Sequence, residues 1–180
     1  DLRGKITYAN SVFLRLSGYT EQELIGAPHS ILRHPHMPRC VFKLLWDTLD
    51  RQEEIFAYVK NMAKNGDHYW VFAHLTPSFD AAGGCIGYHS NRRTAHPDAV
   101  KTISGIYKEL LRIESTQPNT DAAIKAGVAH LMKTLESVGM SYDEFVFSLE
   151  WEKLGNEGSE ATLVTERARV FGGWLVRVGT

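Results

Sequence analysis

Hydrophobic and polar positions change their spacing several times along the first half of the chain. Residues 5–10 alternate apolar and polar side chains, which predicts a short strand. Residues 11–18 and 38–49 carry apolar side chains at helical spacing, with Gly18 as a stop signal and Pro38 in the first turn of the second helix. Strands are predicted for three further runs, which are rich in aromatic and β-branched residues: 55–63, 67–77 and 85–93.

Turn and cap signals divide these elements. Thr20 and Glu23 have the spacing of a capping box, which predicts a one-turn helix ending near Gly26. The sequence KNGD predicts a tight hairpin between the first two strands, and DAAGG predicts the next turn. Strand alternation then puts two sets of side chains on opposite faces, namely Tyr69, Val71, Ala73 and Leu75 against His68, Trp70, Phe72 and His74.

The second half of the chain has a different character. Amphipathic patterns predict helices over 98–114, 120–139 and 141–154, of which the last begins at a Ser cap. The sequence GNEGSE is linker-like, and residues 174–178 form one more strand-like run. We therefore expect a core over 1–95, a helical extension over 96–149, a linker-like joint over 150–170 and a strand within 171–180.

Composition narrows the class of protein. The 180 residues include 43% hydrophobic and 23% charged residues, which is ordinary for a globular protein. A formal net charge of −1 gives no reason to expect binding to nucleic acid. No apolar run approaches the ~20 residues of a membrane span. Cys40 and Cys85 match no metal or redox spacing, so we expect a cytoplasmic protein with reduced thiols.

Four sequence segments resemble one family. GYTEQELIGAPHSILRHPHMP, LLWDTL, VKNMAKNGDHYWV and GYHSNRR are similar, in this order, to flavin-binding PAS domains of the bacterial aerotaxis-receptor type. They resemble more distantly the nitrogen-fixation redox regulator and light-oxygen-voltage (LOV) domains. The resemblance implies an α+β PAS fold, in which a five-stranded antiparallel sheet carries short helices on one face, followed by C-terminal helices. It also implies non-covalent binding of FAD.

The same resemblance implies a set of cofactor-binding residues. His29 stands where LOV domains carry their reactive cysteine, and imidazole cannot form that adduct. Arg33 and His34 lie in RHPHMP, where the family holds FAD with Arg, His and Asp, but His36 replaces the Asp here. The residues alone also allow His29 to be a helix cap and Arg33 to be a structural ion-pair partner.

Three more residues complete the expected site. Trp46 and Asn61 match a Trp and an Asn near the flavin of the nitrogen-fixation regulator, and Asn suits the alternating donors and acceptors of a flavin edge. His89 is aligned with the LOV glutamine that contacts flavin N5 and O4. Trp46 as a core residue and His89 as a residue satisfied within the sheet remain alternatives.

The C-terminal strand is expected to complete the sheet. In the family the first strand ends in Thr-Asp-Leu-x-Gly, and here Thr180 followed by residues 1–4 restores that string. We therefore expect residues 173–178 to supply the first strand, between 5–9 and 86–90, in a circularly permuted chain order. The competing expectation is a trimmed chain with an unrelated C-terminal strand.

The expected function is sensory. Reduction of FAD would rearrange the hydrogen bond of His89 and shift the packing between the sheet and the helices at 97–149, signalling redox state or oxygen in chemotaxis-like signal transduction. The helices would contact a partner protein or a second copy. We expect no enzymatic activity, no catalytic residue and no metal. A haem sensor with His29 or His34 as ligand, and a ligand-free interaction module, are the alternatives.

Overall fold

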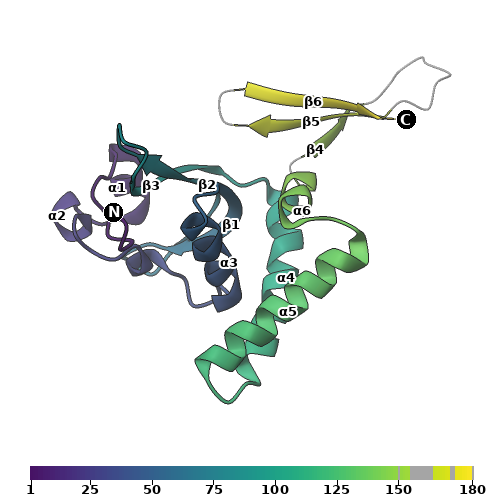
Figure 1. Ribbon diagram of the computed structural model, residues 1–180, viewed down its shortest axis with the longest axis horizontal. Coiled ribbons are helices and arrows are strands. Elements are labelled where there is room, and N and C mark those ends of the chain that lie inside the picture. Colours follow the sequence, from purple (N-terminus) through teal and green to yellow (C-terminus); the bar gives the residue numbers. More distant parts are fainter. Residues whose placement is uncertain (150, 155–163, 171–172, 180) are drawn as a thin grey trace. The chain divides into compact units, whose positions relative to one another are not determined.

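The computed structural model describes residues 1–149, 151–154, 164–170 and 173–179, with side chains over 1–149 (Figure 1). The chain divides into two compact units, Asp1–Thr134 and Leu135–Thr180. The helices are α1 (Ser11–Ser17), α2 (Glu21–Leu24), the 3₁₀ helix η1 (His29–Leu32), α3 (Arg39–Asp50), α4 (Pro97–Ser115), α5 (Thr120–Val138) and α6 (Tyr142–Ser148). The strands are β1 (Ile55–Met62), β2 (His68–Phe79), β3 (Cys85–Thr94), β4 (Trp151–Leu154), β5 (Val164–Val170) and β6 (Gly173–Gly179).

The short N-terminal helices begin and end where their cap residues predict. Asn10 accepts a hydrogen bond from the Phe13 amide at the start of α1, and Gly18 ends that helix with a φ of 71°. The Thr20 and Glu23 side chains form both hydrogen bonds of the capping box of α2. The predicted capping box is thus confirmed.

The predicted strand at residues 5–10 is wrong. This segment forms only an isolated bridge between Lys5 and Pro28. The Ile6 amide donates to the Ala27 carbonyl at 2.9 Å, and the Gly26 amide donates to the Ile6 carbonyl at 2.8 Å. The backbone is extended as expected, but its partner is the turn after α2, which is too short to build a ladder.

The three central strands form an antiparallel sheet in the order β1-β2-β3. The first hairpin closes at the predicted turn, with Met62 opposite His68. The second hairpin pairs Ala73 with Arg92 and Thr76 with His89, and its register shifts between Ser78 and Phe79. Such a bulge changes which side chains of the following strand share a face with those of its neighbour.

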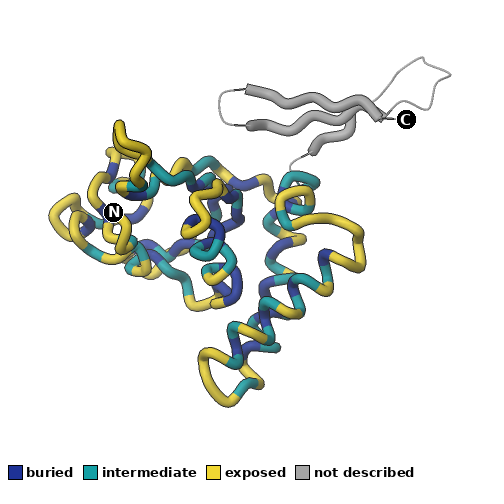
Figure 2. The backbone as a smooth tube through the Cα atoms, viewed as in Figure 1, coloured by how far each residue is buried: buried dark blue, intermediate teal, exposed yellow. Residues whose placement is uncertain are grey.

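The two faces of this sheet meet different helices. Trp70 of β2 lies with its ring centroid 6.0 Å from that of Tyr107 in α4, and the Tyr107 hydroxyl donates to the Tyr58 carbonyl at 2.7 Å. Helix α4 thus packs on the face of the sheet that carries Trp70. The buried positions of α4 recur every three or four residues and so form one stripe: Ala99, Ile103, Tyr107, Leu110 and Glu114. Figure 2 colours the backbone by burial, with buried residues in dark blue.

Glu114 joins α4 to α3. Its carboxylate accepts hydrogen bonds from the amides of Arg39 at 2.9 Å and Cys40 at 2.8 Å, and the residue is only 8% exposed. These amides begin α3, where backbone donors lack partners within the helix and a negative charge is favourable. Pro38, the residue before α3, has no side chain that could cap the helix. A residue 75 positions away therefore does so.

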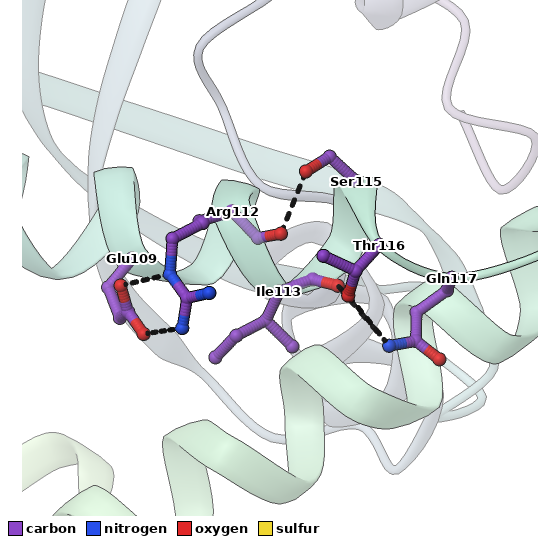
Figure 3. A network of polar contacts seen from close by, with 6 residues as sticks. All are labelled: Glu109, Arg112, Ile113, Ser115, Thr116 and Gln117. Atoms are coloured by element: carbon purple, nitrogen blue, oxygen red, sulfur yellow. Dashed lines mark hydrogen bonds and ion pairs between the residues drawn. The ribbon is translucent and has the colours of Figure 1, made fainter.

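The end of α4 that carries Glu114 is held by its own polar side chains (Figure 3). Arg112 donates two hydrogen bonds to the Glu109 carboxylate, at 2.9 and 2.7 Å. The Thr116 hydroxyl donates to the Ile113 carbonyl at 2.8 Å, and the Ser115 hydroxyl donates to the Arg112 carbonyl at 2.7 Å. The carbonyl groups of Arg112 and Ile113, near the end of α4, thus accept hydrogen bonds from side chains in the same turn as Glu114.

Helix α5 approaches the same point through a glycine. A Cβ atom added to Gly127 would lie 2.8 Å from the Cβ of Cys40 and 3.0 Å from Oε1 of Glu114. The start of α3, the end of α4 and the middle of α5 therefore meet at one tightly packed contact, which we call the Glu114 contact.

The second unit holds a separate sheet in the order β4-β5-β6. β6 pairs with β5 throughout its length, from Gly173 opposite Val170 to Gly179 opposite Val164. The expected pairing of 173–178 with 5–9 and 86–90 is therefore not found, and the permuted chain order loses its support. Only two residues separate β5 from β6 in the sequence, and such neighbours pair at little entropic cost.

Two further expectations concern this unit. The helix predicted over 141–154 ends at Ser148, because residues 151–154 pair with β5 instead. Within the expected joint at 150–170, the described residues form β4 and β5, whereas residues 155–163, which include GNEGSE, lie outside the described residues. The Ser141 cap is confirmed and forms a capping box with Glu144.

Among the described residues, no helix is long and apolar enough to span a membrane.

Replacing Glu114 is expected to destabilise the chain. In Glu114→Gln, the buried amides of Arg39 and Cys40 lose the charge that they face, and we expect the free energy of unfolding to fall by about 1–3 kcal/mol. Glu109→Gln removes an exposed ion pair of the same helix and is expected to cost about 1 kcal/mol or less. Urea denaturation measures both, and equal losses would contradict a capping role for Glu114.

Replacing two helical glycines by alanine, one at a time, is expected to change the free energy of unfolding in opposite directions. Gly105→Ala in α4 meets no atom within 4 Å, so its better helix propensity should stabilise the chain by up to about 1 kcal/mol. Gly127→Ala has the same propensity gain but forces apart the Glu114 contact, so we expect a lower free energy of unfolding. The two urea midpoints test this, and a rise for both variants would show that α5 is not held there.

Candidate functional site

One face of the central sheet, which we call the inner face, carries small and polar side chains among buried aliphatic ones such as Val59 and Val71. In β1 and β2 the residues Ala57 and Ala73 lie opposite each other, and both are fully buried. Arg92 of β3 continues this row, because it is paired with Ala73. Four residues further along β1, Asn61 lies opposite Tyr69. Because side chains alternate along strands, all of these residues belong to the same face.

Three buried donors of the inner face make no well-formed hydrogen bond among the described residues, although the Asn61 side chain lies close enough to the Tyr69 hydroxyl to lower its pKa. They are the amide nitrogen Nδ2 of Asn61, the hydroxyl of Tyr69 and the guanidinium nitrogen Nη1 of Arg92. Asn61 is only 1% exposed. Buried polar atoms without partners are costly and uncommon in proteins, so three on one face indicate a place for a polar ligand rich in acceptors.

His29 closes the inner face from the side of η1. Nη2 of Arg92 lies 2.5 Å from Nε2 of His29. Since a guanidinium only donates, Nε2 must accept, and the neutral imidazole then carries its proton on Nδ1. His29 is therefore part of the site rather than the cap of η1, whose first residues have no side-chain cap.

The environment sets the charge of these groups. The pKa of His29 is lowered from 6.5 to about 3, first because burial disfavours the imidazolium and then because Arg92 is positive. Burial lowers the pKa of Arg92, which nevertheless stays charged at neutral pH. Burial also raises the pKa of Tyr69, which remains a neutral donor. The inner face thus presents one positive charge beside neutral donors.

Arg33 is expected to hold the cofactor, but its side chain turns to α3. Its backbone forms an isolated bridge with Asn61, so the loop after η1 runs beside β1. Its Nη2 atom donates to the Met37 carbonyl at 3.1 Å, and its guanidinium lies 4.7 Å from the centre of the Phe42 ring. The guanidinium also interacts favourably with the charge of Glu114. In this arrangement Arg33 links the inner face to the Glu114 contact.

His34 shapes the loop that follows. Its Nδ1 atom accepts a hydrogen bond from the His36 amide at 3.0 Å, and its ring lies 4.9 and 5.5 Å from the rings of His36 and His68. Burial lowers its pKa to about 4, with smaller contributions from Lys60 and the two histidines. No group of three or more potential ligands in the part of the chain searched could hold a metal ion. His34 does not reach the groups of the inner face.

Trp46 of α3 packs against strand β3. Its ring centroid is 5.6 Å from that of Tyr88 in β3, with an interplanar angle of 73°. Its indole also packs on Gly4, where an added Cβ would lie only 2.9 Å away. Gly4 has a φ of 69°, so both its conformation and this approach require glycine.

His89 lies on the face opposite Asn61. It is exposed, it is paired with Thr76, and its Nε2 atom contacts the Asn91 side chain at 3.1 Å. Arg92 is three residues further along the strand and so projects to the other side. The register therefore places Arg92, and not His89, on the inner face.

Arg92 and Tyr69 are the site residues that sequence reasoning missed. Alternation within 85–94 shows that Arg92 and His89 point to opposite faces but does not show which face is inward. That depends on the register with β2, which the bulge at Ser78 and Phe79 sets. The position of Tyr69 could be predicted in part, since alternation places it on the same face of the strand as Val71 and Ala73.

Cys40 is unsuited to covalent chemistry. It is fully buried, and its pKa is raised by burial and by the neighbouring Glu114 carboxylate. The reactive form of cysteine is the thiolate, which this environment disfavours. The thiol is instead part of the Glu114 contact.

These features have counterparts among known proteins. Residues 6–92 match the family described as the PAS fold. The aerotaxis receptor of Escherichia coli strain K12 is 44% identical over 110 residues, which are 61% of this chain and 22% of the receptor. A nitrogen fixation regulatory protein of Klebsiella pneumoniae is 30% identical over 93 residues, which are 52% of this chain and 19% of that protein.

Solved structures agree with this fold. A light-oxygen-voltage domain studied with a flavin analogue has a TM-score of 0.52 at 23% identity, over 58% of this chain and 78% of that one. The light state of the Aureochrome1 LOV photoreceptor has a TM-score of 0.50 at 22% identity, over 56% of this chain and 79% of that one. At such identity the likeness concerns the fold alone. The chain spans only about a fifth of the two sequence relatives, 22% and 19% of their lengths.

The buried imidazole of His29 predicts a pH dependence of stability. Between pH 6.5 and about 3 the unfolded chain binds a proton at this residue that the folded chain does not bind. The free energy of unfolding should therefore fall as the pH falls through this window, by at most about 1.4 kcal/mol per pH unit. His29→Gln should remove this contribution.

Urea denaturation of the flavin-free chain at several pH values between about 7 and 5 measures the effect. His89→Gln makes the same change at an exposed histidine on the opposite face and serves as the matched control. Equal slopes for the two variants would contradict the burial of His29.

Proposed function

We propose that residues 1–95 form a sensory domain that binds FAD non-covalently and reports redox state, or oxygen indirectly, through the packing of its sheet against α4. The observation that carries this proposal is the set of three unpartnered donors on the inner face, from Asn61, Tyr69 and Arg92. The similarity to aerotaxis receptors over 61% of the chain supports FAD as the ligand.

The donor set fits the polar edge of a flavin. The isoalloxazine ring offers several acceptors, its carbonyl oxygens and ring nitrogens, and a single N–H donor. The inner face offers the complementary set, because Asn61 can both donate and accept, whereas Arg92 only donates. The side chains of Ala57 and Ala73 at the centre of this face are small, so a flat ring there would meet little side-chain bulk from the sheet itself. A bound flavin would supply reversible uptake of electrons and protons.

Each residue of the site has a separate task in this proposal. Asn61 and Tyr69 orient the ring by hydrogen bonds, and His29 holds the guanidinium of Arg92 in place. Trp46 packs against Tyr88 and so borders the inner face at β3. Arg33 and His34 keep the loop over 33–38 in shape, which supports the cofactor indirectly.

Two connections lead from the inner face to the helices. The first crosses the sheet, where Tyr58 and Trp70 contact Tyr107 of α4. The second follows the loop from Arg33 to the start of α3 and on to Glu114. Both end on α4, so a change at the inner face can alter the position of this helix. We infer that α4 and α5 carry the signal to a partner protein or to a second copy.

Haem binding is a weaker candidate. His29 was its expected ligand, but Nε2 of this residue accepts a hydrogen bond from Arg92. His34 was the alternative ligand, but its Nδ1 atom accepts from the His36 amide. The third candidate, a ligand-free interaction module, leaves three buried donors without a purpose.

The visible spectrum of the purified chain tests the proposal. We expect flavin absorption that bleaches with dithionite and returns in air, and FAD in the supernatant after heat denaturation. Asn61→Leu, a variant of similar volume without donors, should retain much less FAD, whereas Asn91→Leu on the opposite face should retain the wild-type amount. A Soret band would establish the haem sensor, and a colourless chain that takes up no added FAD would establish the interaction module.

A further inference from the structure

Arg92 differs from the other donors of the inner face because it carries a full charge. Its Nη1 atom is buried and has no hydrogen-bond partner among the described residues. Within residues 1–149 no acidic side chain forms an ion pair with its guanidinium. Its Nη2 atom donates to the neutral His29, and its Nε atom donates to the Ser90 hydroxyl at 3.2 Å. A buried cation without a counter-ion is unfavourable in the chain alone.

The surroundings keep this charge in place. Burial and the neighbouring Arg92 hold His29 neutral, so that it accepts from the guanidinium rather than repelling it. The Phe13 ring lies 6.0 Å from the guanidinium carbon and adds a weak cation–π contact. Neutral partners position the guanidinium without cancelling its charge, which remains available to a ligand.

We propose that Arg92 is the residue through which this site distinguishes the two redox states of its flavin, by binding the reduced ring more tightly than the oxidised ring. This inference rests on the proposed function. Reduction makes the ring more electron-rich, and a fixed positive charge in a site of low dielectric favours the state with more negative charge. Arg92 therefore raises the reduction potential, while Asn61 and Tyr69, being neutral, bind both states similarly.

The same charge also couples the redox state to the sheet. Arg92 lies in β3 opposite Ala73 of β2, and the next residue, Arg93, lies with its guanidinium carbon 4.6 Å from the centre of the Phe72 ring on the other face. A change in the electrostatic attraction between Arg92 and its ligand would thus shift the backbone at Arg93, which lies on the face that contacts α4.

The test compares Arg92→Gln with Arg93→Gln in the full chain loaded with FAD. The two variants make the same change in net charge on opposite faces of one strand. Arg92→Gln should weaken binding of the reduced flavin relative to the oxidised flavin at least about tenfold, a fall in midpoint potential of about 30 mV for a two-electron couple. Arg93→Gln should leave the midpoint unchanged, and Arg92→Lys, which keeps the charge, should fall between wild type and Arg92→Gln.

A second readout needs no flavin. Because Arg92 is an uncompensated buried cation, the flavin-free Arg92→Gln chain should unfold at a higher urea concentration than the flavin-free wild type. A lower urea midpoint would show that Arg92 serves the fold, and would overturn the inference that its charge is kept for a ligand.

The outcomes separate this inference from the proposed function. A wild-type chain that binds no FAD overturns both. A wild-type chain that binds FAD, with equal midpoints for wild type and Arg92→Gln or equal falls in both Gln variants, overturns the inference alone. Loss of oxidised and reduced FAD to the same degree in Arg92→Gln also overturns it, because Arg92 would then bind the two states equally.

Discussion

The structure of the first unit depends on the capping of α3 by Glu114. Helix α3 follows Pro38, which offers no cap, so its first amides would be buried without acceptors. The carboxylate that satisfies them comes from the end of α4, which fixes the loop over 33–38, α3 and α4 relative to one another. Gly127 adds α5 to the same point, because any side chain there would displace the carboxylate. The end of α4 and the middle of α5 are thus packed into the first unit.

This arrangement changes the meaning of the loop residues. Arg33 and His34 resemble cofactor ligands when the sequence is viewed alone, yet their side chains are engaged within the loop and with α3. A residue can be necessary for ligand binding in two ways, by contact or by holding the residues that make contact. Asn61 and Arg92 have the geometry of the first kind, and Arg33 has that of the second.

Local sequence signals predicted local structure well. The capping box of Thr20 and Glu23, the hairpin at 63–67 and the amphipathic pattern of α4 all depend on residues close together in the chain, and each is found where expected. Three features depend on how separate elements pair with one another and were missed. They are the bulge that places Arg92 inward, the capping of α3 by Glu114 and the pairing of β4 and β6 with β5. No spacing rule within a single strand or helix contains this information.

The unpartnered donors finally suggest why the domain can respond to its ligand at all. A site whose polar groups satisfied one another would gain little from a cofactor and would not change when the cofactor changes. Here three buried donors, one of them charged, are left without acceptors in the chain. Their cost is offset only when a ligand supplies acceptors, and the charged donor makes the gain depend on the ligand's own charge. Under the proposed function, stability of the chain and sensitivity to redox state are therefore opposed at Arg92, whereas the Glu114 contact stabilises the chain at a place where no ligand is needed.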